Sequence, residues 1–422
     1  MATQQVLDLK STPRTYIADR VAMRVTLSVM LVAFLALVTL VARSPNRFLY
    51  DETYFANYIL LLNRYGLTPT FLNSLNAAPG PLCAFVQATF EPLTKLRPVE
   101  MRFVNVFSLI TVTLILVTSL KLKANDYWSA GLSVLVVPMV WLVGGMALSE
   151  MSAMVFVTLS LYLQLRGLDE FGAGRSAVLW FMAAGVCLGI AVWGRQPYLL
   201  LCGGAVLLAL IERGLRVPVA IFVGTTCILA TPLFAIWKGF VPPSQHLVPG
   251  FSVIHALLSF GYTGFCFILL GARSRWLNVR AVIALTMLTI LANAFSGALA
   301  LYPLKSLVER CLAPSATRLY GNLAGSLFLS FGVLSLAILL RMIWESRRDL
   351  RALTINTGLL CVVAAPLFDT HLYSSRYTAM SLPYLILAAQ PWRQWSMKAL
   401  MLAVLGCGLG FLSLNEYFSF AQ

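Results

Sequence analysis

The first long apolar run, VTLSVMLVAFLALVTLVA at residues 25–42, decides the fold class of this chain. It contains no charged residue, and roughly 17 to 25 mostly apolar residues are enough for a helix to cross the hydrocarbon layer of a bilayer. Similar runs continue to the C-terminus, so that 59% of the 422 residues are hydrophobic and the mean hydropathy is +0.82. One soluble core could not bury so much apolar sequence, and only helices satisfy every backbone group within a single lipid-embedded segment. The chain is therefore expected to be an all-α, polytopic membrane protein.

The apolar runs predict about thirteen transmembrane helices, and we expect them to form a single integral membrane domain over residues 1–422. The run at 81–90 is too short to cross and is expected to form a helix in the membrane interface. The thirteen expected spans lie near residues 25–42, 103–119, 128–144, 149–165, 177–194, 198–211, 217–236, 252–271, 281–300, 323–340, 352–368, 377–390 and 397–414.

The distribution of basic residues predicts how the chain is oriented. Most of the 31 Lys and Arg residues fall between spans on the same side as the N-terminus, which places that side in the cytoplasm. The net charge of +15 is then an orientation signal and an attraction to anionic membrane lipids, and no nucleic-acid partner is expected.

Residues 43–102 form a long outer segment after the first span, with amphipathic stretches rich in Tyr, Phe and Leu. A segment of this length inside a compact protein is usually functional or disordered, and its aromatic content disfavours disorder. The stretch LYDETYF at 49–55 places two acids, Asp51 and Glu52, directly after the membrane boundary. Their alternative role is structural, because acids in the first turn of a helix stabilise its dipole.

Other polar residues of the outer side are flanked at once by apolar sequence. Ionisable groups at membrane depth cost several kcal/mol unless they pair or face a wet cavity, which makes them candidate functional groups. Arginines at helix ends more often anchor the helix in the interface, and we interpret Arg43, Arg47, Arg102 and Lys238 in that way. The candidates are Glu150 in MALSEMSAMVF, Arg195 and Gln196 in AVWGRQPYLLL, and Asp369, His371 and Arg376 in LFDTHLYSSRY.

An outer carboxylate together with arginines from distant spans suits a reaction in which a hydroxyl attacks while a phosphate departs. The carboxylate can accept the proton of the hydroxyl as a general base. The planar, permanently charged guanidinium groups can neutralise the charge that grows on the phosphate. No glycine-rich nucleotide-phosphate loop is present, so these residues predict a lipid-phosphate donor.

An acidic pair in the segment after the first helix, followed by a multi-span body, resembles the GT-C superfamily of membrane glycosyltransferases, which use polyprenyl- or dolichyl-phosphate sugars. Several short stretches are more specifically similar to the dolichyl-phosphate-glucose-dependent alpha-1,2-glucosyltransferases of N-glycan precursor assembly, and they occur in the same order. The chain departs from that pattern at Tyr50, where the family has Met, and at TPTFLNSLN, residues 68–76. The matching stretches are YDETYF, NAAPGPL, MRFVNVFSL, LSEMSAMVF, WGRQPYLLL and SSRYTAMSLPYLIL.

The resemblance implies a role for each candidate residue. Asp51 would be the base that activates the acceptor, and Glu52 a supporting acid. Arg195 and Arg376 would contact the donor phosphate, and Glu150 and Gln196 the sugar or the acceptor. Tyr377, which follows Arg376 in the matched motif, is expected among the substrate-binding residues. His371 is left between two roles, a contact to the donor phosphate and a cap for its loop.

These observations together predict a membrane glycosyltransferase of GT-C-like fold. It would transfer a hexose, with glucose the first candidate, from a polyprenyl-phosphate sugar to a hydroxyl of a glycan or lipid-linked glycan, with inversion at the sugar carbon. No metal and no cofactor are expected. The expected location is the bacterial inner membrane with a periplasmic active site, and the alternative is the endoplasmic reticulum with a lumenal one.

Two other classes of protein remain open from the sequence. A multi-span transporter or lipid flippase would also hold buried charges, although the chain shows no convincing internal repeat of the kind common in transporters. A structural scaffold in a membrane complex would leave Asp51, Arg195 and Arg376 far apart. The enzyme requires that these three residues converge on one outer cavity.

Overall fold

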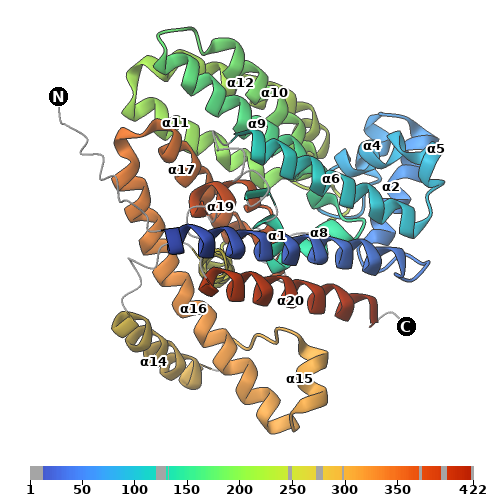
Figure 1. Cartoon of the computed structure of the whole chain (residues 1–422). Helices are drawn as coiled ribbons and strands as arrows, with labels where there is room; N and C mark the ends of the chain where they lie inside the picture. Colours follow the sequence, from blue (N-terminus) through green and yellow to red (C-terminus); the bar gives the residue numbers. More distant parts are fainter. Residues whose placement is uncertain are drawn as a thin grey trace, which may run out of the picture.

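The computed structural model describes residues 13–119, 130–131, 133–245, 250–271, 279–296, 299–369, 373–390 and 397–419. Throughout these segments the secondary structure is helical, and no strand occurs in them (Figure 1). The all-α class expected from the apolar runs is confirmed for this part of the chain.

The N-terminal part consists of two long helices with four short helices between them. The expected outer segment 43–102 is therefore folded rather than extended, and the predicted helix at 81–90 is present as α4. The short helices gather at one end of the molecule in Figure 1. In chain order the helices are α1 (Pro13–Ala42), α2 (Glu52–Tyr65), α3 (Pro69–Asn73), α4 (Leu82–Thr89), α5 (Glu91–Thr94) and α6 (Pro98–Ser119).

The central part packs three long helices side by side: α9 against α10, and α10 against α12 (Figure 1). Short 3-10 turns separate several of its helices. The elements are η1 (Ser133–Val136), α8 (Pro138–Gly145), α9 (Ser149–Gly172), α10 (Val178–Gly194), η2 (Gln196–Leu200), α11 (Leu201–Ile211), η3 (Arg213–Leu215) and α12 (Arg216–Trp237).

The C-terminal part begins with a group in which α13 and α14 pack against the long helix α16, and it ends with α20, which returns to α1 and α8 (Figure 1). Its elements are α13 (Val253–Leu269), α14 (Val279–Ser296), α15 (Lys305–Cys311), α16 (Pro314–Glu345), η5 (Ser346–Arg348), α17 (Leu350–Ala364), η6 (Ala365–Phe368), α18 (Arg376–Ala379), α19 (Leu382–Ala389) and α20 (Met397–Ser419).

Helix α20 approaches α8 unusually closely because it carries glycine at the crossing. A Cβ atom added at Gly410 would lie 2.2 Å from Cδ1 of Trp141, a buried side chain of α8. Any larger residue would therefore push the two helices apart. This contact joins the end of the chain to the segment that leads into α9.

Long apolar helices make the chain an integral membrane protein. In the described segments, six helices are long and apolar enough to cross a membrane: Pro98–Ser119, Ser149–Gly172, Arg213–Trp237, Pro314–Arg348, Leu350–Phe368 and Met397–Ser419. Shorter apolar helices cover five further expected spans: Leu27–Ala42, Val178–Gly194, Gln196–Ile211, Val253–Leu269 and Ile283–Phe295. The expected count of about thirteen spans is not confirmed.

Two expected spans are interrupted within the described residues. In the described residues from 133 to 144, this run contains the 3-10 turn η1 and then the short helix α8, which starts at Pro138. The run at 377–390 is divided into α18 and α19, with Pro383 in the first turn of α19. Proline has no N–H and is favoured at a helix start, so both apolar runs are broken where a proline begins a new helix.

Candidate active site

The adjacent acids Asp51 and Glu52 send their side chains to different partners. Asp51 occupies the N-cap position of α2, but its carboxylate makes no capping bond to the helix. Its side chain is 35% exposed, whereas that of Glu52 is completely buried. The carboxylate of Asp51 is therefore available to groups outside α2, and Glu52 belongs to the interior.

Glu52 forms a two-pronged ion pair with Arg102 of α6. Arg102 Nε donates to Oε1 at 2.9 Å and Nη2 to Oε2 at 2.6 Å. The same carboxylate accepts the backbone N–H groups of Leu49 and Ala147, each at 2.8 Å. Both oxygens of Glu52 are thus occupied by protein donors. Glu52 was expected as a supporting acid, and these contacts make it a buried support for the loop before α2.

Arg102 also holds the loop before α2 from the other side. Its remaining donors reach the hydroxyl of Ser44 at 2.7 Å and the carbonyls of Pro45 and Arg47 at 2.7 and 2.8 Å. The interpretation of Arg102 as an interfacial anchor is therefore wrong, because its side chain is fully buried. A guanidinium with this many charge-assisted bonds fixes the position from which Asp51 leaves the loop.

Asn105, one turn further along α6, fixes the irregular connection between α8 and α9. Its amide donates to the carbonyls of Val143, Met146 and Leu148 at 3.2, 2.6 and 2.8 Å. Buried backbone outside a helix needs such partners, since an unpaired buried carbonyl is costly. The motif MRFVNVFSL therefore organises two segments at once through its Arg and its Asn.

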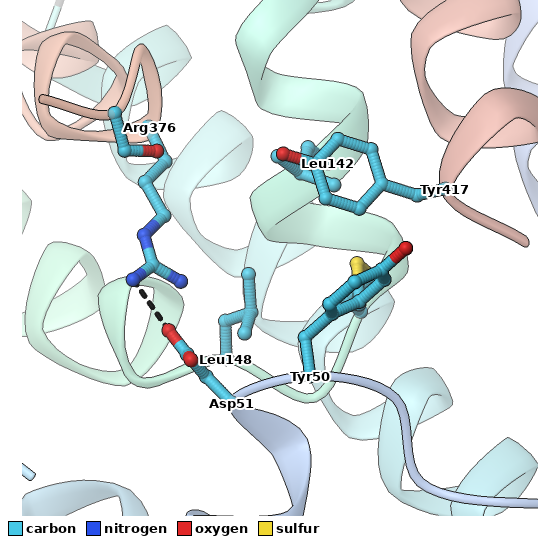
Figure 2. Close-up of a pocket in the computed structure, with 8 residues that line it drawn as sticks. Tyr50, Asp51, Leu142, Leu148, Arg376 and Tyr417 are labelled. Carbon is cyan, nitrogen blue, oxygen red and sulfur yellow. Dashed lines mark ion pairs between the residues drawn. The ribbon is translucent and has the colours of Figure 1, made fainter. Parts of the chain in front are cut away.

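A pocket of about 200 Å³ opens beside Asp51 (Figure 2). The carboxylate of Asp51 is ion-paired with Nη2 of Arg376 from α18, and both residues line the pocket. Tyr50 and Tyr417 form an aromatic wall, with ring centroids 5.5 Å apart and planes at 75°. The lining residues are Tyr50, Asp51, Leu142, Met146, Leu148, Ser374, Arg376 and Tyr417.

Glu150 lies behind this pocket and joins two arginines. One carboxylate oxygen, Oε1, is ion-paired with Nη2 of Arg195 and lies 3.4 Å from Nε of Arg376. Glu150 is completely buried, and the side chain of Arg195 is 8% exposed. Neither residue lines the pocket. Arg376 is therefore the arginine that faces the pocket, and Arg195 supports it through Glu150.

The protonation of Arg376 follows from its surroundings. Burial by itself lowers the pKa of the Arg376 guanidinium, but attraction to Glu150 and Asp51 outweighs burial and raises the pKa above its ordinary value. Arg376 is therefore a permanent cation at the wall of the pocket. With Asp51, Glu150 and Arg195 it forms a connected network of two acids and two arginines, whose formal charges cancel.

Gln196 follows Arg195 and stabilises the turn at residues 76–81 rather than the pocket. Its amide donates to the carbonyl of Ala78 at 2.9 Å. The turn approaches the end of α10 so closely that a Cβ atom at Gly80 would lie 2.0 Å from the carbonyl oxygen of Trp193. This bond places Gln196 as a support for the turn, and its expected contact with sugar or acceptor stays a prediction.

Tyr377 lies next to Arg376, with the guanidinium carbon 6.0 Å from its ring centroid. Its phenol can donate or accept a hydrogen bond. The preceding Tyr373 bonds to the hydroxyl of Thr378 at 2.8 Å, which ties the start of α18 to the adjoining segment. His371 falls outside the described residues, so its two expected roles stay open.

The structure thus brings together residues from remote parts of the sequence. Asp51, Arg376, Glu150 and Arg195 form one continuous series of ion pairs. Asp51 and Arg376 meet at the pocket, whereas Arg195 is joined to them through Glu150 and does not line it, so the wide separation expected of a scaffold is not seen. In the described part of the chain, no group of three or more His, Cys, Asp and Glu residues is arranged to hold a metal ion.

Sequence reasoning missed three contributors to the site. Arg102 carried a usable signal, because the matched motif MRFVNVFSL contains it, although it was interpreted as an interfacial anchor. Tyr417 and Ser374 carried none, since an aromatic residue in the last apolar helix and a serine in a polar loop are common. Only the packing of α20 and the path of the chain before α18 place them at the pocket.

Comparison with known proteins adds a likeness of overall shape. No protein-family model and no curated protein matches this chain. The crystal structure of ArnT from Cupriavidus metallidurans in the apo state is similar at 15% identity and a TM-score of 0.45, covering 97% of this chain and 78% of ArnT. The same ArnT bound to undecaprenyl phosphate is similar at 14% identity and a TM-score of 0.46, with the same coverage. Likeness at this level does not assign a function, which is argued below from the site itself.

Proposed function

We propose that this protein is a membrane glycosyltransferase that takes its sugar from a polyprenyl-phosphate donor. The observation that carries the proposal is the pocket shared by Asp51 and Arg376, where a carboxylate and a permanent cation face each other beside an aromatic wall. A carboxylate of this kind can accept the proton of an attacking hydroxyl. A guanidinium can hold the phosphate that leaves.

The reaction at this site is a displacement at the anomeric carbon of the donor sugar. An oxygen of the acceptor hydroxyl forms a bond to that carbon while the bond from the carbon to the phosphate oxygen breaks. The hydroxyl proton passes to Asp51, and the bonding electrons stay on the departing phosphate. Attack from the side opposite the phosphate inverts the configuration at the carbon.

The donor must first change the pairing of Arg376. Asp51 is engaged by Arg376 in this structure, so a hydroxyl that entered alone would meet a carboxylate already in use. The donor phosphate is an anion and competes with Asp51 for the same guanidinium. Once the phosphate holds Arg376, Asp51 is released to act as the base.

The size and lining of the pocket fit a phosphate with part of one sugar. Drug-sized ligands usually occupy about 300 to 1,000 Å³, and the pocket of about 200 Å³ is smaller. Its apolar wall, formed by Leu142, Met146 and Leu148, suits the first carbons of a lipid chain. The undecaprenyl phosphate bound to ArnT belongs to the chemical class proposed here, but the proposal stands on the pocket.

Finer features of the proposal come from the sequence motifs. The resemblance of the ordered motifs favours a hexose, with glucose first, and a glycan or lipid-linked glycan as the acceptor. The charge distribution favours a site on the periplasmic or lumenal side, in a bacterial inner membrane or alternatively in the endoplasmic reticulum. No metal is required in this mechanism, because Arg376 neutralises the charge of a monophosphate.

The test is reconstitution of the purified protein in lipid vesicles with radiolabelled polyprenyl-phosphate sugars and a mixture of lipid-linked glycans. We expect a new glycosidic bond and release of polyprenyl phosphate. The Asp51→Asn variant should lower the turnover about 10²- to 10⁴-fold, the usual contribution of a general base. Equal turnover by the wild type and by Asp51→Asn would show that Asp51 is not the general base. Movement of sugar across the vesicle membrane without a new bond would favour a transporter.

A further inference from the structure

The two buried glutamates near the pocket are satisfied to different degrees. Glu52 uses both oxygens, which accept from Arg102 and from two backbone N–H groups. Glu150 uses only Oε1, and its Oε2 is buried without a hydrogen-bond partner. Nε of Arg195 is also buried without one. The arrangement of Glu52 stabilises the fold. That of Glu150 does not do so to the same extent, because a buried charge with only half of its hydrogen bonds made is costly.

The position of Glu150 between two arginines suggests a role other than stabilising the fold. Its Oε1 lies between Arg195, which is withdrawn from the pocket, and Arg376, which faces it. Glu150 therefore lies within ion-pair distance of Arg376, whose Nε is also buried without a hydrogen-bond partner, and it cancels one of the two positive charges. When Asp51 releases Arg376, the two arginines and Glu150 together present a single net positive charge to the pocket.

We propose that Glu150 is a positioning residue that sets the charge preference of the phosphate site, so that a singly charged phosphodiester is favoured over a doubly charged phosphate. The inference rests on the proposed function and specifies its donor. A sugar linked to a lipid through one phosphate is a phosphodiester with one negative charge. A pyrophosphate-linked donor carries more charge and is disfavoured.

The same arrangement assists release of the product. Transfer of the sugar turns the phosphodiester into a phosphate monoester, which carries close to two negative charges above its second pKa of about 6. The single net positive charge matches the donor better than the product. Removing the charge of Glu150 would leave two arginines with Asp51 as the one remaining acid of the network and would retain the product.

Two lipid probes separate charge from shape. A polyprenyl phosphate monoester and its methyl diester share one lipid chain and differ by about one charge at pH 8. Their affinities for the wild-type protein and for Glu150→Gln, measured in nanodiscs, give a diester-to-monoester ratio for each protein. We expect Glu150→Gln to shift this ratio about tenfold toward the monoester, which corresponds to about 1.4 kcal/mol. Inhibition of turnover by the monoester should rise in parallel.

Two further variants provide the controls. Glu309→Gln removes the same charge from the exposed side of α15, where Glu309 pairs only with Lys305 at 3.7 Å, and should leave the ratio unchanged. Glu150→Asp retains the charge with a shorter side chain, and should lower both affinities while keeping the wild-type ratio. Glu150→Asp also keeps the inference testable if Glu150→Gln does not fold. A change in the diester-to-monoester affinity ratio of Glu150→Asp would overturn the inference.

The outcomes distinguish this inference from the proposed function. If Glu150→Gln lowers the affinities for both probes by the same factor, Glu150 is a structural residue only and the inference is wrong. If the wild-type protein binds neither probe, the proposed function fails together with the inference. A shifted ratio supports the inference through binding alone, whether or not the correct sugar and acceptor have been found.

Discussion

Arg376, near the C-terminal end of the chain, is ion-paired with Asp51 at the start of α2 (Figure 2). The pair places a cation and a carboxylate on the wall of one pocket. Each neutralises the other until the phosphate of a donor displaces Asp51 from Arg376. Most of what we expect of this protein in solution follows from that contact and from the buried residues that hold its two members in place.

Replacement of Arg376 should weaken donor binding and slow transfer. Arg376→Gln removes the only guanidinium that lines the pocket within the described residues, and loss of one such group commonly costs about 10²- to 10³-fold in rate. The rate of Arg376→Lys should lie between those of the wild type and Arg376→Gln. A lysine keeps the charge but lacks the planar guanidinium that contacts both Asp51 and Glu150. Steady-state kinetics with varied donor will check this. Exposed Arg310 on α15 supplies the control, Arg310→Gln, whose rate should equal that of the wild type.

The donor should bind before the acceptor. Since Asp51 is free only after the donor phosphate has taken Arg376, an unreactive acceptor analogue that still donates a hydrogen bond to Asp51 should bind only to the donor complex. We expect this analogue to be an uncompetitive inhibitor against the donor. A mixed pattern in the same initial-rate plots would show that acceptors bind to the free protein, contrary to the proposed order.

The pair of Glu52 and Arg102 should govern stability more than chemistry. Removing one partner of a buried ion pair usually costs about 3 to 5 kcal/mol, so Glu52→Gln should lower the unfolding temperature clearly. Arg102→Met should do the same. The double variant should lose less than the sum of the two single losses, because no unpaired charge remains. Thermal unfolding in detergent measures all three, and a Glu52→Gln protein as stable as the wild type would contradict the buried pairing.

The turn at residues 76–81 should tolerate no side chain at Gly80. Gly80→Ala would place a Cβ atom 2.0 Å from a backbone oxygen of Trp193, and such overpacking commonly costs about 1 to 3 kcal/mol. Gly203→Ala in α11 is the matched control, because no heavy atom lies within 4 Å of the added carbon. The control should be neutral or slightly more stable in the same unfolding measurement. Equal effects of the two substitutions would argue against the close approach.

Apolar length predicted several helices well, including α12, which continues through Pro232, but it failed at two other runs that contain a proline. The runs at 103–119 and 149–165 are present as α6 and α9, since nothing in them interrupts the backbone bonds. The runs that contain Pro138 and Pro383 were predicted as single spans, and both are broken. Hydropathy measures how apolar a segment is, and says nothing about whether its hydrogen bonds continue through it.

The sequence singled out four residues that the structure joins by ion pairs, but it did not predict how they are arranged. Charge at a membrane boundary was a sufficient signal for Asp51, Glu150, Arg195 and Arg376, which the structure connects. The same signal could not show that Asp51 faces the pocket while Glu52 is buried. That difference depends on Arg102 and on the connection between α8 and α9 that Asn105 holds. It also could not show that Glu150 faces two arginines rather than the substrate.

The pocket draws its walls from both ends of the polypeptide, with Tyr50 and Asp51 from the beginning, and Arg376 and Tyr417 from α18 and α20. During synthesis the early acid enters the membrane long before its cationic partner exists. A ribosome must complete α18 and α20 before the walls of this pocket can be assembled. A chain released before α18 should therefore lack activity altogether, however well its first helices are inserted.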